Sequence, residues 1–254
     1  MPLKYAANLS FLWKELPYFD RFDAAAAAGF GAVEVLFPYD VAVPETLNAL
    51  GRNSLRMVLM NAPPPNYTGG ARGFAAEPDK VDRFHFDMRR AKRYAAALGV
   101  DCLHVMSGKG TGEAAKETLI SNLKRAAADL PKSLTLTIEP LNQDDNPGYF
   151  MSDYALAAEV IEAVGAGNVG LQFDSYHAQV IHGDAVAVYD AYAPLIRHIQ
   201  IGDTPKRGAP GTGAVDFKAL FARIEASAYK GWISGEYLCD GATEDSLSNW
   251  MKPL

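Results

Sequence analysis

Four strand-like segments in the second half of the chain end on a side chain that can bind a metal. They are LTLTIE, VGLQFD, IRHIQ and GWISGE, which end at Glu139, Asp174, Gln200 and Glu236. Apolar and polar residues alternate in these segments with the period of a strand, and the ligand residue comes last on the polar face. Parallel strands that end on polar groups at one rim are typical of a (β/α)8 barrel. Three carboxylates and an amide suit a hard divalent ion.

Strand-like and helix-like patterns alternate along the whole chain, and 254 residues is near the usual length of one barrel. The sequence therefore predicts an α/β fold, a single (β/α)8 TIM barrel, with residues 1–254 as one domain. Four glycines, Gly29, Gly51, Gly99 and Gly165, stand where a helix should end before the next strand. The predicted strands are Lys4–Leu9, Ala32–Leu36, Arg56–Met60, Cys102–Met106, Leu134–Glu139, Val169–Asp174, Ile196–Ile201 and Trp232–Glu236.

An open, doubly wound sheet is the alternative architecture. The run from Gly165 to Gly170 matches the GxGxxG pattern of dinucleotide-binding proteins. It follows a helix-like segment and precedes a strand-like one, whereas the dinucleotide motif requires the reverse order. We expect this run to be a turn between a helix and a strand.

The composition of the chain argues against several kinds of binding partner and cellular location. The net charge is −6 and the basic residues are scattered, which argues against a nucleic acid or an anionic membrane as partner. Only Cys102 and Cys239 are present, without CxxC spacing, so neither a disulfide framework nor a zinc knuckle is indicated. The amino terminus does not have the pattern of a signal peptide, and no apolar run reaches membrane-spanning length. We expect a cytoplasmic enzyme; whether it forms a homo-oligomer stays open.

Glu139 and Glu236 are the candidate proton carriers. Each ends a predicted strand on its inward face, at positions that would let two carboxylates flank a bound small molecule. A single glutamate at a strand end could equally cap a helix or pair with a surface lysine. Four coincident polar strand ends favour the functional interpretation.

A histidine and several cations surround these strand ends. His177 follows Asp174 and could orient a substrate oxygen or bind a metal, whereas His198 lies one layer deeper and is expected to form a hydrogen bond inside the barrel. The loop GDTPKRGAPGTG carries Arg207, which could bind a carboxylate through two parallel hydrogen bonds. Arg72 and Lys109 lie on other loops of the same rim. His85, His104 and His182 have no partner pattern.

Together these segments resemble the hydroxypyruvate isomerase family, within the xylose isomerase-like barrels. The resemblance runs nearly end to end and rests on ANLS, FPYD, GGARGFAA, IEPLN, QFDSYH, HIQIGDTPKRGAPGTG and GW..GEY. It implies one Mg²⁺ or Mn²⁺ held by Glu139, Asp174, Gln200 and Glu236, with the two glutamates as acid and base. It also implies substrate contacts from His177 and Arg207, with Asp145 in the same pocket.

The reaction that the resemblance implies interconverts hydroxypyruvate and tartronate semialdehyde through an enediolate. A 2-oxo-tetronate of one more carbon is the nearest alternative substrate. Related ketose 3-epimerases have histidine where this chain has Gln200, which favours the isomerases. A DNA-repair endonuclease on a related barrel and a catalytically silent sugar-acid binding protein are the other classes considered; acidity argues against the first, and retention of both glutamates against the second.

Overall fold

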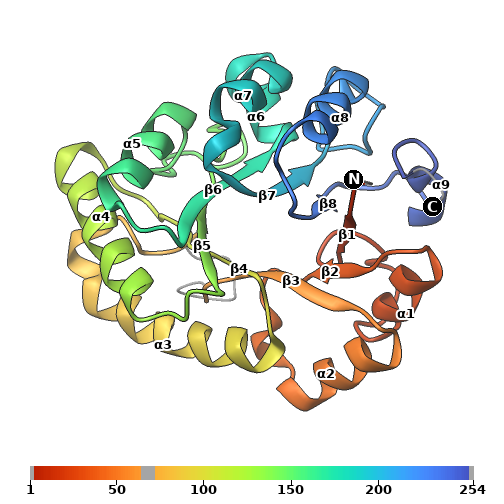
Figure 1. The fold of residues 1–254 in the computed structure, drawn as a ribbon, viewed down its shortest axis with the longest axis horizontal. Coiled ribbons are helices and arrows are strands. Elements are labelled where there is room, and N and C mark those ends of the chain that lie inside the picture. Colours follow the sequence, from red (N-terminus) through yellow and green to blue (C-terminus); the bar gives the residue numbers. More distant parts are fainter. Residues whose placement is uncertain (1–2, 64–71, 252–254) are drawn as a thin grey trace.

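The computed structural model describes residues 3–63 and 72–251 and contains a closed barrel of eight parallel strands (Figure 1). The strands pair in the order of the sequence, and β1 closes the barrel against β8, so the predicted (β/α)8 fold is confirmed. Residues 66–71, which belong to the loop that carries Arg72, lie outside the described residues. The first residue of the segment considered as a signal peptide, Met1, lies outside them too. The strands are β1 (Tyr5–Asn8), β2 (Ala32–Glu34), β3 (Arg56–Asn61), β4 (Cys102–His104), β5 (Thr135–Ile138), β6 (Val169–Asp174), β7 (Ile196–Ile201) and β8 (Ile233–Gly235).

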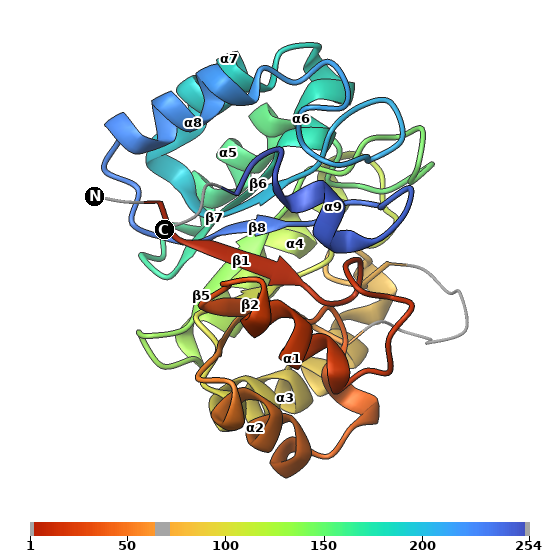
Figure 2. The same cartoon turned by 90° about the vertical axis from the view of Figure 1, so that its right-hand side faces the viewer.

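Helices surround the strands on the outside of the barrel (Figure 1). Figure 2 shows α9 beside the segment that follows β1, where the backbone N–H of Trp13 donates to Thr243 Oγ1 at 2.9 Å. The α-helices are α1 (Asp20–Ala27), α2 (Val43–Arg52), α3 (Val81–Leu98), α4 (Gly112–Ala128), α5 (Tyr154–Val164), α6 (Ser175–His182), α7 (Ala185–Tyr192), α8 (Phe217–Ala226) and α9 (Thr243–Leu247); short 3-10 helices are η1 (Pro38–Asp40), η2 (Pro78–Lys80) and η3 (Ala193–Leu195).

Alternation along the strands divides the barrel into an apolar shell and a polar mouth. Leu136 and Ile138 of β5 pack in the large apolar core between strands and helices, while Thr137 points inward and donates to Gln172 at 2.9 Å. Ala6 and Ala32 face the interior at the amino-terminal end of the barrel. The inward positions two residues further along β1 and β2 are polar, so the interior changes from apolar to polar toward the carboxyl ends of the strands.

The predicted strand boundaries match the observed ones for β6 and β7 and differ by one or two residues at one or both ends of the other six strands. Glu139 and Glu236 lie directly beyond β5 and β8 rather than inside them. Gly99 and Gly165 end their helices in the left-handed conformation, as expected. The prediction for Gly51 is wrong, because α2 continues through it to Arg52. The GxGxxG match is the turn between α5 and β6, as the sequence order indicated.

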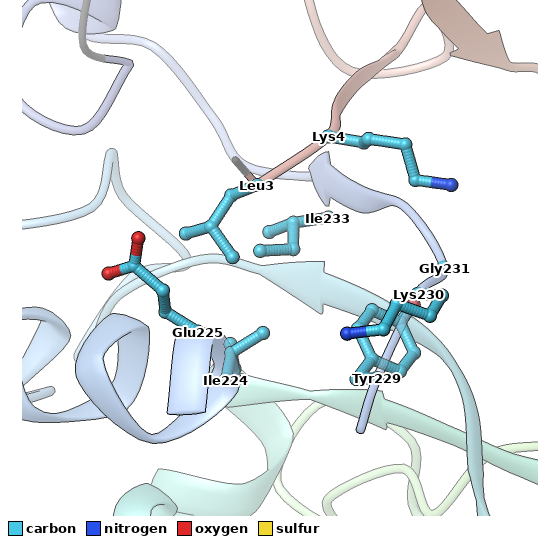
Figure 3. A pocket seen from close by; sticks show the side chains of 8 residues that line it. All are labelled: Leu3, Lys4, Ile224, Glu225, Tyr229, Lys230, Gly231 and Ile233. Carbon is cyan, nitrogen blue, oxygen red and sulfur yellow. The ribbon is translucent and has the colours of Figure 1, made fainter. Parts of the chain in front are cut away.

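A hollow opens at the amino-terminal end of the barrel, away from the predicted site. Figure 3 shows Leu3, Ile224 and Ile233 in its lining, with Lys4 and Lys230 beside them. Ile233 begins β8, Leu3 and Lys4 precede β1, and Ile224 lies in the last turn of α8, whereas the metal-ligand candidates lie at the other end of the strands. Among the described residues no helix has the length and apolar character needed to cross a membrane.

Candidate active site

Carboxylates at the strand ends form one buried acidic cluster. Glu34 and Asp174 end β2 and β6, and Glu139 and Glu236 directly follow β5 and β8. None of the four is more than 5% exposed. Because the strands are parallel and the sheet is closed, their carboxyl ends meet at one rim. Carboxylates this deep in a protein lose hydration and repel one another, so the cluster needs positive charge and hydrogen-bond donors.

Arg207 supplies that positive charge. Its Nη2 donates to Asp174 Oδ2 at 2.5 Å and to Glu236 Oε1, and its Nε donates to the Glu236 carbonyl at 3.2 Å. The guanidinium also lies 5.1 Å from the ring centre of Phe11 and 5.2 Å from that of Tyr176. Burial alone would lower the pKa of Arg207, but the two carboxylates outweigh it and raise that pKa. The sequence did not predict that this arginine contacts two candidate metal ligands.

Asp203 holds the Arg207 loop in place. Its carboxylate is fully buried and accepts backbone N–H groups from Thr204, Gly211, Gly213 and Val215 at 2.8 to 3.0 Å. A side chain at Gly213 would put its Cβ 1.6 Å from the Thr204 carbonyl oxygen, so the loop can close on itself only with glycine there. The Asp203 carboxylate therefore gives a fixed conformation to a loop for which the sequence predicts no regular structure.

His177 is neutral and faces the cluster. Burial lowers its pKa well below the usual value, and the charges of Arg207 and Arg72 add to the effect. The Asn142 backbone N–H donates to Nδ1 at 3.1 Å, which places the ring hydrogen of the neutral form on Nε2. Nε2 lies 3.0 Å from Arg207 Nη1, so two donors face each other. This tautomer suits donation to a substrate oxygen better than metal binding.

Gln200 lies beside Glu236, as the expected ligand set requires, but its amide is already engaged. Its nitrogen donates to Glu34 Oε2 at 2.8 Å and to Glu236 Oε2, while its oxygen accepts from Gln172 at 2.7 Å. Gln172 donates in turn to Glu139 Oε2 at 2.9 Å. The amide oxygen would have to leave Gln172 before it could bind a metal.

Other predicted residues lie around the rim. Asp145 is exposed and accepts from the Tyr176 hydroxyl at 2.7 Å and from Asn142 Nδ2 at 3.1 Å. Arg72 lies near enough for its charge to contribute to the low pKa of His177. The Lys109 side chain is exposed, and among the described residues it makes no hydrogen bond or ion pair with the acidic cluster.

A metal could use part of this cluster. Glu139, Asp174 and His177 each have a possible ligand atom within 4.8 Å of the other two, although the Asn142 backbone N–H already uses the lone pair on Nδ1 of His177. Glu139 Oε1 is buried and has no hydrogen-bond partner among the described residues, so one strong donor atom is free. Glu236 and Asp174 both contact Nη2 of Arg207. The donors fit a hard divalent cation, provided that Arg207 gives up its place between the two carboxylates.

Comparison with known proteins assigns the chain to a family. The family model described as xylose isomerase-like TIM barrel matches residues 22–254. The chain belongs to this family. It is 38% identical to hydroxypyruvate isomerase of Escherichia coli K12 over 99% of both chains, and 39% identical to 2-oxo-tetronate isomerase of Cupriavidus necator over 98% of both. A crystal structure from Brucella melitensis described as AP endonuclease, family 2, has a TM-score of 0.93 at 38% identity, and the match covers 98% of this chain and 97% of that one.

The chain is therefore an isomerase of the xylose isomerase-like family.

The site of the isomerase contains polar residues that the sequence did not predict. Strands β1 and β2 end on Asn8 and Glu34, and the pattern of a polar residue at the end of a strand, which identified the other candidates, also holds for these two. His104, for which no partner pattern was found, lies 3.6 Å from Glu139 at the end of β4. The expected role of His198 inside the barrel is confirmed by its contact with Glu34.

The two glutamates of the isomerase have different surroundings. Glu236 accepts hydrogen bonds from Asn8, Gln200 and Arg207, whereas Glu139 accepts one, from Gln172. Burial raises the pKa of both. For Glu236 the Arg207 charge opposes that rise and the pKa is about 8; for Glu139 the charges of Asp174 and Glu236 add to it, and the pKa lies well above the ordinary value. The two carboxyl groups therefore have raised pKa values for different reasons: the Arg207 charge limits the rise for Glu236, whereas for Glu139 the neighbouring negative charges add to the effect of burial.

This difference predicts how stability of the metal-free isomerase depends on pH. A folded-state pKa of about 8 against an ordinary 4.5 means that folded Glu236 binds a proton that the unfolded chain has released between these values. Its stabilising contribution is full below pH 4.5 and is lost as pH rises through 8, with a slope of up to ~1.4 kcal/mol per pH unit.

We therefore expect Glu236→Gln to flatten the fall in unfolding free energy between pH 5 and pH 8, measured by urea denaturation in the presence of a chelator. Glu162→Gln, at an exposed position of α5, is the matched control and should leave the slope unchanged. Equal slopes for wild type and Glu236→Gln would show that Glu236 is already ionised throughout this range.

Proposed function

We propose that the protein interconverts hydroxypyruvate and tartronate semialdehyde (2-hydroxy-3-oxopropanoate). The observation that carries this proposal is the pairing at one rim of two buried glutamates with unlike hydrogen-bond surroundings, three side-chain donors at Glu236 and one at Glu139 among the described residues. Moving a carbonyl between adjacent carbons needs a base at one carbon and an acid at the other, and unlike environments supply both. Full-length similarity to a protein named hydroxypyruvate isomerase supports the choice of substrate.

In the proposed mechanism Glu236 is the base in its ionised form, which predominates above its pKa of about 8, and Glu139 is the acid. Glu236 takes a proton from the hydroxylated carbon and Glu139 returns one to the neighbouring carbon, while the hydroxyl proton passes from one oxygen to the other. Both glutamates regain their starting protonation by exchange with water. His177 Nε2–H would donate to a substrate oxygen, and Arg207 with Arg72 would hold the substrate carboxylate.

A divalent cation belongs to this proposal, with Mg²⁺ or Mn²⁺ as the candidates. Glu139, Asp174 and Glu236 would hold it through oxygen atoms, with Gln200 as the fourth ligand. When bound, it would supply positive charge that stabilises the enediolate, an effect worth several kcal/mol in metal enzymes. The unpartnered Glu139 Oε1 supports the site, since a buried oxygen without a donor is costly.

We further propose that residues 1–254 act as one domain in the cytoplasm on a small hydroxy-oxo acid. Both cysteines are free, which agrees with a reducing compartment. The second candidate substrate is a 2-oxo-tetronate, because a protein of that name is as similar to this chain as the hydroxypyruvate isomerase is. A ketose 3-epimerase activity is the weaker alternative.

A substrate panel tests the proposed activity. We expect kcat/KM for hydroxypyruvate to exceed that for a 2-oxo-tetronate, and both to exceed that for uncharged ketoses, measured with and without added Mg²⁺ or Mn²⁺. A reversed order of the two acids would assign the protein to the longer substrate. Cleavage of DNA at an abasic site, without turnover of either acid, would contradict the isomerase and support the activity named for the Brucella structure.

Replacement of either glutamate tests the proton route. Glu139→Gln and Glu236→Gln should each lower kcat by ~10²–10⁴-fold, the usual contribution of acid–base groups. Turnover by the wild type in D₂O should place deuterium on the carbon that becomes hydroxylated, because Glu139, which delivers the proton to that carbon, exchanges its proton with solvent. Retention of all label from substrate deuterated at carbon would instead indicate a hydride shift.

Arg207 and a metal should compete for Asp174 and Glu236. A unit charge about 4 Å from another contributes ~4 kcal/mol of repulsion at an effective dielectric constant of 20, so the guanidinium should weaken cation binding. We expect Arg207→Met to bind Mn²⁺ at least tenfold more tightly than wild type in the absence of substrate, measured by electron paramagnetic resonance. Arg207→Lys, which keeps the charge, and Arg89→Met, which removes an exposed charge, should change the affinity little. Unchanged affinity in Arg207→Met would place the metal elsewhere.

A further inference from the structure

Glu34 is a buried carboxylate that the proposed reaction does not use. It ends β2 and is fully buried, and it accepts hydrogen bonds from Asn8 Nδ2 at 3.0 Å and from Gln200 Nε2 at 2.8 Å. His198 contacts its other oxygen, Oε1, from the layer below. A buried charge is costly unless paired, and here each oxygen has a partner.

The same two amides bind Glu236. Asn8 Nδ2 donates to Glu236 Oε2 at 2.7 Å, and Gln200 Nε2 donates to the same oxygen. An amide nitrogen carries two hydrogens, so each amide gives one to Glu34 and one to Glu236. The two carboxylates are therefore joined through two bridging NH₂ groups, and the oxygen of Glu236 that faces Arg207 is the one left outside the bridge.

Neither amide is free to turn over. Asn8 Oδ1 accepts the Ser10 backbone N–H at 3.0 Å, and Gln200 Oε1 accepts from Gln172 at 2.7 Å. Reversing either amide would break that bond and place an oxygen against two carboxylates. Glu34 is the acceptor that makes the observed orientation the favourable one for both.

We infer that Glu34 is a positioning residue, which fixes Oε2 of Glu236 through Asn8 and Gln200 and so aims Oε1 at the substrate. The inference rests on the proposed role of Glu236 as base. A base that is free to rotate about its last bond spends less time aligned with the carbon to be deprotonated, and displacement by about 1 Å can cost ~10²-fold in rate. Loss of Glu34 should therefore slow proton abstraction more than it weakens substrate binding.

Glu34→Gln is the central variant, because it keeps the shape and replaces one acceptor oxygen by a donor. We expect kcat to fall ~10–100-fold with KM changed less than about threefold, and the isotope effect on kcat with carbon-deuterated substrate to increase. Glu162→Gln makes the same chemical change at an exposed position and should match wild type. If Glu34→Gln does not fold, Glu34→Asp, which keeps the charge and withdraws it by one methylene, should show the same selective loss of kcat.

A double-mutant cycle with Asn8→Ala separates positioning from a general structural effect. Because both residues act on the same oxygen of Glu236, the double variant should lose little more kcat than Glu34→Gln alone. Additive losses, or kcat within threefold of wild type in Glu34→Gln, would overturn the inference. The proposed function fails separately, if Glu236→Gln itself keeps wild-type kcat.

Discussion

The site depends on the burial of four carboxylates at one rim of the barrel. Glu34, Glu139, Asp174 and Glu236 have lost almost all contact with water, and the negative charges of Asp174 and Glu34 raise the pKa of both Glu139 and Glu236. Many of the other polar side chains at the rim offset this negative charge. Arg207 neutralises two of them, and amide side chains donate to three. Because Asp203 orders the loop that carries Arg207, the constraint extends to a backbone segment outside the cluster.

Unlike surroundings give chemically identical groups separate roles. Glu236 is surrounded by donors, which stabilise its charged form, whereas Glu139 has one oxygen without a donor and two negative neighbours. One fold can thus offer an acid and a base at the same pH. The barrel makes this arrangement possible, because each strand carries its own residue to the rim and neighbouring strands then set the environment.

Membership of the xylose isomerase-like family establishes the fold and the type of reaction but leaves the substrate open, since relatives of nearly equal similarity are named for two acids of different length. We expect a choice between such acids to depend on side chains at the rim, because the acidic cluster would contact the reacting carbons that both acids share. Asp145, Tyr176 and Asn142 form a hydrogen-bonded edge there, and Arg72 adds positive charge.

Sequence alone determined the barrel, its strand order and three of the four carboxylates at the strand ends, because alternation within a strand and repetition of strand and helix are local patterns. It did not reveal that Arg207 lies between Asp174 and Glu236, nor that Glu34 reaches Glu236 through Asn8 and Gln200. Those contacts join β1, β2, β7 and β8, residues that become neighbours only when the sheet closes. Tertiary structure therefore decided which carboxylates Arg207 neutralises and which carboxylate oxygen each amide binds. It also decided which charges act on the pKa of each glutamate. Each of these depends on distances between side chains that come from opposite ends of the chain.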